Sequence, residues 1–202
     1  MDTPVFCIVG ASGTGKTTTV NNIVDNYGRI DVIVSHTTRD RREGEVDGRD
    51  YHFVSDFEFD QQTKLEKVEY DGNRYCLSYE EMTKKLNSSD NCVLLVITDI
   101  HGLRQLEMLF NNSGPFSKHR LYSVYFKASI FELLKRLIKR DGIKGIKRVW
   151  HALKAGELRG KEEQKLFDLV FDTGEIEEEE APDILVSKII MKLEEDMDGQ
   201  IG

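Results

Sequence analysis

An eight-residue segment near the amino end constrains the fold more than any other part of the sequence. Residues 10–17 read Gly-Ala-Ser-Gly-Thr-Gly-Lys-Thr and match every fixed position of the pattern G-x-x-x-x-G-K-[ST]. Residues 4–9 before it form a short apolar run, typical of a buried strand. Residues 17–27 after it lack Gly and Pro and space their apolar side chains at helical intervals. Strand, glycine-rich turn and helix together predict a phosphate-binding loop rather than a chance match.

The residue types of this segment suit a nucleoside triphosphate. Glycines let successive backbone N–H groups turn toward phosphate oxygens, and the helix that follows adds its positive N-terminal end. Lys16 is expected to reach the β- and γ-phosphates, while the Thr17 hydroxyl is expected to hold Mg²⁺. The residues expected to bind ATP are Gly10, Ala11, Ser12, Gly13, Thr14, Gly15, Lys16, Thr17 and Thr18.

Length and charge limit the other possibilities. The 202 residues suit one domain. There are 28 Lys and Arg against 36 Asp and Glu, a formal charge of −8, which argues against general binding of nucleic acid or anionic membranes. No signal peptide or membrane-length apolar run is visible, and the three cysteines lack metal-ligand spacing, so we expect a reduced, cytoplasmic protein.

Strand-like and helix-like segments alternate along the chain. This order predicts an α/β fold with a parallel sheet flanked by helices. The expected strands are 4–9, 30–34, 64–69, 74–77, 92–97, 121–126 and 169–171. The expected helices are 17–27, 78–86, 103–110, 129–140, 146–158 and 182–197.

Residues 35–54 form a polar segment with three arginines in four positions, at 39–42. Such a segment can be a solvated loop. Long polar loops in compact domains are often functional, however, and arginines that follow a phosphate-binding loop favour a second phosphate site.

Four motifs follow the phosphate-binding loop in order. The first comprises 35–39 (Ser-His-Thr-Thr-Arg), Arg42, Gly44, Glu45, Gly48 and 50–54 (Asp-Tyr-His-Phe-Val). The later ones comprise Glu69, Gly72, Asn73 and Tyr75, then Asp99 and Gly102, then Arg136, Leu137, Arg140 and Arg148. Together with the loop, these motifs resemble those of guanylate kinases over most of the chain.

The resemblance implies a P-loop kinase built as a single guanylate-kinase-like domain over residues 1–202. The core is expected at about 1–34, 91–140 and 161–202. An inserted monophosphate-binding region is expected at about 35–90, and a short lid at about 141–160.

The resemblance also implies ATP-dependent phosphorylation of GMP or dGMP to GDP or dGDP by direct in-line transfer, with Mg²⁺. The expected partners are small nucleotides rather than nucleic acid or membrane, and the protein is expected to be a monomer or homodimer. The residues expected to bind the monophosphate are Ser35, Arg39, Arg42, Glu45, Tyr51, Glu69, Tyr75 and Asp99. Those expected to act in catalysis are Lys16, Arg39, Arg136, Arg140 and Arg148.

In this interpretation Glu69 reads guanine, since a carboxylate accepts from the adjacent N1–H and 2-amino groups. Arginines and phenols suit a dianionic phosphate. Asp99 is a possible metal partner through water. The acceptor phosphate is already ionised, so catalysis needs alignment and positive charge more than a base.

The sequence departs from the family at Cys76, Leu77 and Ile97. Leu77 replaces a hydroxyl that contacts the base in the family. These positions leave open a related kinase whose acceptor is another nucleotide or a sugar phosphate. A non-catalytic interaction domain is a further alternative, which the intact phosphate-binding loop opposes.

Overall fold

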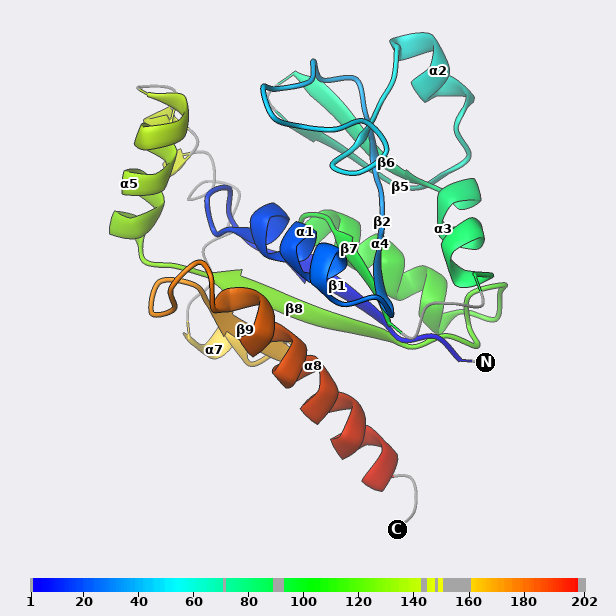
Figure 1. The fold of residues 1–202 in the computed structure, drawn as a ribbon. Helices are drawn as coiled ribbons and strands as arrows, with labels where there is room; N and C mark the ends of the chain where they lie inside the picture. The colour runs from blue at the N-terminus through cyan, green and yellow to red at the C-terminus, as the bar shows by residue number, and fades with distance from the viewer. Residues whose placement is uncertain are drawn as a thin grey trace.

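A five-stranded sheet forms the centre of the molecule (Figure 1). The computed structural model describes residues 2–70, 72–88, 93–142, 145–147, 149–150 and 161–199. The strands run in the order β2-β7-β1-β8-β9, and every neighbouring pair is parallel. Their bounds are β1 Val5–Val9, β2 Ile30–Ile33, β7 Val93–Ile97, β8 Leu121–Lys127 and β9 Leu169–Asp172. The predicted α/β class is therefore confirmed.

Both faces of this sheet are covered by helices. Alternate residues of β1 enter two separate cores, because side chains of a strand point to opposite faces. Phe6 and Ile8 pack with the helices α1 (Lys16–Asn26) and α8 (Ala181–Asp198). Val5, Cys7 and Val9 face the side covered by α3 (Tyr79–Leu86) and α4 (Ile100–Asn111).

A second sheet stands beside the first, with strand order β4-β3-β6-β5 (Figure 1). Only two residues separate β2 from β3, so the chain passes directly from one sheet to the other. The strands of this second sheet are β3 His36–Thr37, β4 His52–Phe53, β5 Lys64–Tyr70 and β6 Asn73–Ser78. The helix α2 spans Asp56–Gln61.

Four short elements were not predicted: the strands β3 and β4 and the helices α2 and α7 (Lys161–Gln164). The strands β3 and β4 have two residues each, too few to show an alternating pattern. Ser55 and Glu58 form a capping box that starts α2, a start signal that the sequence does contain.

The remaining helices are α5 (Ile130–Asp141) and α7 (Lys161–Gln164). Of the expected helix 146–158, residues 146, 147, 149 and 150 are helical, and 148 and 151–158 lie outside the described residues. Among the helices of the described residues, none combines the length and the apolar character needed to cross a membrane.

Candidate active site

The predicted phosphate-binding loop joins β1 to α1. At Gly10 the backbone has φ 144°, and a side chain there would collide with the carbonyl oxygen of Phe126 on β8. Gly15 caps α1 in the left-handed conformation, with φ 85°. The local backbone therefore requires glycine at both positions, and the loop reaches the end of the sheet where ligands bind in open α/β folds.

The ammonium group of Lys16 lies across this loop. Its Nζ donates to the carbonyl oxygen of Gly10 at 2.6 Å and to that of Ala11 at 3.0 Å. A cation held on loop carbonyls in this way is in place to bridge to phosphate oxygens.

A cavity of about 260 Å³ begins at this loop and extends to the second sheet. Its walls come from several elements and junctions, between residue 10 and residue 140 of the sequence. The lining residues are Gly10, Ser12, Gly13, Gly15, Lys16, Thr17, Thr18, Ser35, Arg39, Arg42, Tyr51, Glu66, Val68, Asn73, Tyr75, Ile97, Thr98, Asp99 and Arg140. Most of the predicted site residues are thus brought together.

The arginines of the polar segment gather around Glu45. Arg39 Nη2 donates to both carboxylate oxygens of Glu45, at 2.7 and 3.0 Å, and the backbone N–H of Arg42 donates to one of them at 2.8 Å. Burial disfavours a charged Glu45, but the hydrogen bonds from these two residues outweigh it and hold its pKa below the ordinary value. Glu45 is therefore an anion that holds Arg39, and it does not itself line the cavity.

Two phenol rings complete this end of the cavity. The Arg39 guanidinium lies 5.5 Å from the ring centre of Tyr51, and the rings of Tyr51 and Tyr75 meet edge to face at 5.8 Å. Burial raises the pKa of the Tyr51 phenol, so this group stays neutral and able to donate.

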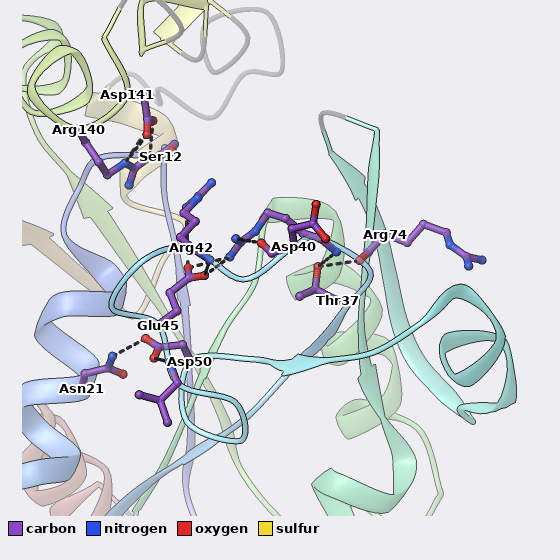
Figure 2. A network of polar contacts seen from close by, with 12 residues as sticks. Ser12, Asn21, Thr37, Asp40, Arg42, Glu45, Asp50, Arg74, Arg140 and Asp141 are labelled. Carbon is purple, nitrogen blue, oxygen red and sulfur yellow. Dashed lines mark hydrogen bonds and ion pairs between the residues drawn. The ribbon is translucent and has the colours of Figure 1, made fainter.

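Figure 2 shows how the polar segment is tied to the core. Asn21 of α1 donates from Nδ2 to Asp50 Oδ1 at 2.8 Å, and Asp50 accepts from the Val46 N–H at 2.8 Å. The loop that carries Glu45 is thereby fixed to the helix that follows the phosphate-binding loop.

The structure contradicts the expectation that Glu69 faces the acceptor. Its side chain is 65% exposed, forms an ion pair with Lys67 at 2.8 Å and is absent from the cavity wall. Glu66 lies in the cavity instead. In β5, side chains alternate between faces, so two glutamates three residues apart point in opposite directions.

The pairing of β5 with β6 explains why Glu66, and not Glu69, faces the cavity. Val68 lies opposite Tyr75 and both line the cavity, whereas Glu69 lies opposite Arg74 on the other face. The sequence held a signal that the prediction missed: Glu69 shares its face with the charged Lys67, and Glu66 shares its face with the apolar Val68.

Glu66 is a deeply buried carboxyl group. It is 3% exposed, and its Oε2 has no hydrogen-bond partner among the described residues. Burial raises its pKa to about 8, with a contribution from the negative charge of Asp99. Gly102 leaves room for it, since a Cβ there would lie 2.8 Å from Oε2. The Thr98 side chain and the Leu77 backbone act on this carboxyl group in the opposite direction and lower its pKa, but burial outweighs them. The Oε2 atom remains an acceptor that a ligand with donors would satisfy.

The end of β7 contributes a further wall. Asp99 lines the cavity and accepts from the Gly102 N–H at 2.8 Å, which caps α4. Ile97 lines the cavity beside it.

Leu77 is fully buried in the core and does not line the cavity, so it does not form an apolar wall against the ligand.

The expected lid arginines differ in position. Arg140 lines the cavity, donates to Ser12 Oγ at 3.4 Å and pairs with Asp141 at 2.9 Å (Figure 2). Arg136 lies behind the phosphate-binding loop, where it donates to Thr173 and stays off the cavity wall. Arg148 lies outside the described residues.

Ala11 and Thr14 are fully buried and are not part of the cavity wall. Their carbonyl oxygens serve instead as hydrogen-bond acceptors within and behind the loop. Besides Glu66, the structure adds three cavity residues that sequence reasoning missed: Val68, Asn73 and Thr98.

Comparison with known proteins identifies the family of this chain. The family model described as guanylate kinase matches residues 2–184. The guanylate kinase of Neisseria gonorrhoeae is 33% identical over 181 residues, which cover 87% of this chain and 82% of that protein. The guanylate kinase of Neisseria meningitidis serogroup A is 41% identical over 106 residues, about half of each chain.

Solved structures show the same fold. The guanylate kinase of Anaplasma phagocytophilum superposes with a TM-score of 0.63 at 20% identity, over 95% of this chain and 86% of that one. TT1252 of Thermus thermophilus gives a TM-score of 0.52 at 13% identity, over 96% and 99%. With the family model spanning most of the sequence, the chain belongs to the guanylate kinase family.

Proposed function

We propose that this protein transfers the γ-phosphate of ATP directly to GMP or dGMP, giving GDP or dGDP and ADP. The observation that carries the proposal is one continuous cavity with a phosphate-binding loop at one end and a buried carboxyl group at the other. The wall of the same cavity also carries a cluster of arginines and tyrosines that suits the phosphate of the acceptor.

The triphosphate end binds and stabilises charge. Lys16 moves from the loop carbonyls to the β- and γ-phosphate oxygens, and Arg140 approaches the transferring group from α5. The Thr17 hydroxyl and Asp99 line the same cavity and fit Mg²⁺, which needs only one or two protein ligands beside phosphates and water. A bound Mg²⁺ would neutralise phosphate charge there.

The acceptor phosphate is held by charge-assisted hydrogen bonds. Arg39 and Arg42 supply guanidinium groups, and Tyr51 and Tyr75 supply phenol donors. Glu45 keeps Arg39 in position for this contact. Since the phosphate oxygen is already ionised, alignment with the γ-phosphate replaces a general base.

Glu66 recognises the base in place of Glu69. Its ionised carboxylate accepts from the N1–H and 2-amino groups of guanine. Adenine has no donor at N1 and no 2-amino group, so it would leave the buried carboxyl without its partners.

We further propose that residues from about 35 to 90, which include the second sheet and α2, form the monophosphate-binding region, and that residues from about 141 to 160 form the lid. We expect a cytoplasmic protein that acts as a monomer or homodimer on small nucleotides.

A coupled ADP-release assay over the eight common ribo- and deoxyribonucleoside monophosphates tests the proposal. GMP and dGMP should be the fastest acceptors. Faster turnover of an adenine or pyrimidine nucleotide would point to a shifted acceptor. No turnover with any of them, despite ATP binding, would point to a nucleotide-binding interaction domain.

A further inference from the structure

Thr173 lies just after β9 and joins segments that are far apart in the sequence. It is 5% exposed, and its backbone N–H donates to the carbonyl oxygen of Lys127 at the end of β8, at 2.9 Å. Its hydroxyl donates to the carbonyl oxygen of Thr14 in the phosphate-binding loop, also at 2.9 Å. A second, longer contact of the hydroxyl reaches the Lys127 carbonyl at 3.2 Å.

The same residue also anchors Arg136 of α5. Arg136 Nη2 donates to the carbonyl oxygen of Thr173 at 2.8 Å, and Nη1 donates to its hydroxyl oxygen at 3.2 Å. Nη1 also lies 3.5 Å from the carbonyl oxygen of Gly13. The Thr173 hydroxyl is thus a hydrogen-bond donor to the loop and a hydrogen-bond acceptor from Arg136.

These contacts fix the orientation of a loop peptide. In a planar trans peptide, the carbonyl of one residue and the N–H of the next point in opposite directions. The Thr14 carbonyl is held toward β9, behind the loop. The N–H of Gly15 is therefore turned to the opposite side, and Gly15 lines the cavity.

We infer that Thr173 is a positioning residue of the triphosphate site, which holds the Thr14–Gly15 peptide and Arg136 in the arrangement that receives phosphate. The inference rests on the proposed function only in that the loop binds a nucleotide polyphosphate. Thr173 is outside the cavity wall and acts through the loop and Arg136.

The test compares Thr173→Val with Thr173→Ser, using ADP and GMP as separate ligands in calorimetry. Valine keeps the shape and removes the hydroxyl, so the Kd for ADP should rise about five- to tenfold, the usual value of one hydrogen bond. The Kd for GMP should stay within about twofold, because the acceptor site does not contact Thr173. Serine keeps the hydroxyl and should bring ADP binding back to within about twofold of wild type.

Thr83→Val is a matched control. The Thr83 hydroxyl on α3 is buried without a hydrogen-bond partner among the described residues, and it is absent from the cavity wall. This variant should bind ADP as wild type does. If Thr173→Val does not fold, Thr173→Cys retains a weak donor and should give an ADP Kd between those of wild type and the Arg136→Ala variant.

A double-mutant cycle with Arg136→Ala separates positioning from general stability. Both substitutions release the same anchor, so their combined effect on ADP binding should be smaller than the product of the single effects. Unchanged ADP binding in Thr173→Val, or equal weakening of ADP and GMP, would overturn the inference. Failure of wild type to phosphorylate GMP would refute the proposed function but leave this ADP comparison intact.

Discussion

The two ends of the cavity are built in different ways. The triphosphate end comes mainly from one contiguous segment, residues 10–18, which runs from the end of β1 into the first turn of α1, and Arg140 and Asp99 add to it from α5 and the end of β7. The acceptor end is assembled from the loop after β3, from β5 and β6, and from the end of β7. A contiguous segment carries its geometry in its own backbone, whereas an assembled site depends on how separate strands pair.

Because of this difference, a sequence pattern predicts the residues of the triphosphate end more reliably than those of the acceptor end. The spacing of glycines, lysine and threonine places the loop directly. On β5, by contrast, a change of one residue moves a side chain to the other face of the sheet. Glu66 and Glu69 are both carboxylates of one strand, yet only Glu66 enters the cavity.

The largest expected effect is at the triphosphate end. Lys16→Ala removes a charge placed at the transferring phosphate, which typically costs about 3–4 kcal/mol of transition-state stabilisation, or a loss of roughly 100- to 1,000-fold in kcat. Circular dichroism should show an unchanged fold, and GMP binding by calorimetry should persist. Near wild-type turnover by the folded variant would show that Lys16 does not stabilise the transferring phosphate.

Glu66 and Glu69 on β5 form a matched pair of carboxylates on opposite faces of one strand. Glu66→Gln places an amide N–H₂ or a neutral oxygen opposite two guanine donors. It should lower kcat/KM for GMP by an amount equivalent to about 1.5–3 kcal/mol, the range for hydrogen bonds to a charged group. Glu69→Gln should leave it unchanged, because that side chain is 65% exposed on the opposite face. The readout is the ratio of kcat/KM for GMP and AMP. A larger effect from Glu69 than from Glu66 would contradict the strand register as the determinant.

Within the polar segment, the arginines should rank by their burial. Arg39→Ala should weaken GMP binding by about 1.5–3 kcal/mol. Arg42→Ala should cost less, since its side chain is 38% exposed against 10% for Arg39. Arg41→Ala is the control from the same segment, because Arg41 is exposed. Calorimetry with GMP and with ADP checks the ranking; equal weakening of ADP binding would show that the two ends are not separable.

The smallest expected effect is a pH dependence confined to the acceptor end. Since burial raises the pKa of Glu66 to about 8, most of this group is protonated at neutral pH. Guanine needs the ionised form, so GMP affinity should rise with pH, by roughly eightfold between pH 7 and pH 8.5, and fall as pH decreases.

Calorimetric titrations of GMP across this range measure the effect, with the acceptor phosphate dianionic throughout. Glu66→Gln should give a flat profile, and ADP binding should not show the trend. A pH-independent GMP Kd in wild type would mean that Glu66 is not the group that binds guanine.

The sequence by itself determined the α/β class, the phosphate-binding loop and most of the arginine and tyrosine cluster. Each of these is set by short-range patterns: the loop by the spacing of residues 10–17, and the strands by apolar runs such as 92–97. Arg39, Arg42 and Tyr51 lie close together along the chain, so a motif could group them before any fold was known.

Only the tertiary structure decided the rest. The pairing of β5 with β6 selected Glu66 over Glu69, because strand register sets which face of the sheet a side chain occupies. Long-range packing buried Leu77 in the core and placed Thr173, 159 residues further along the chain, behind Thr14. Contacts at such separations form only when the strands pair and the helices pack on them, so no local sequence pattern predicts them.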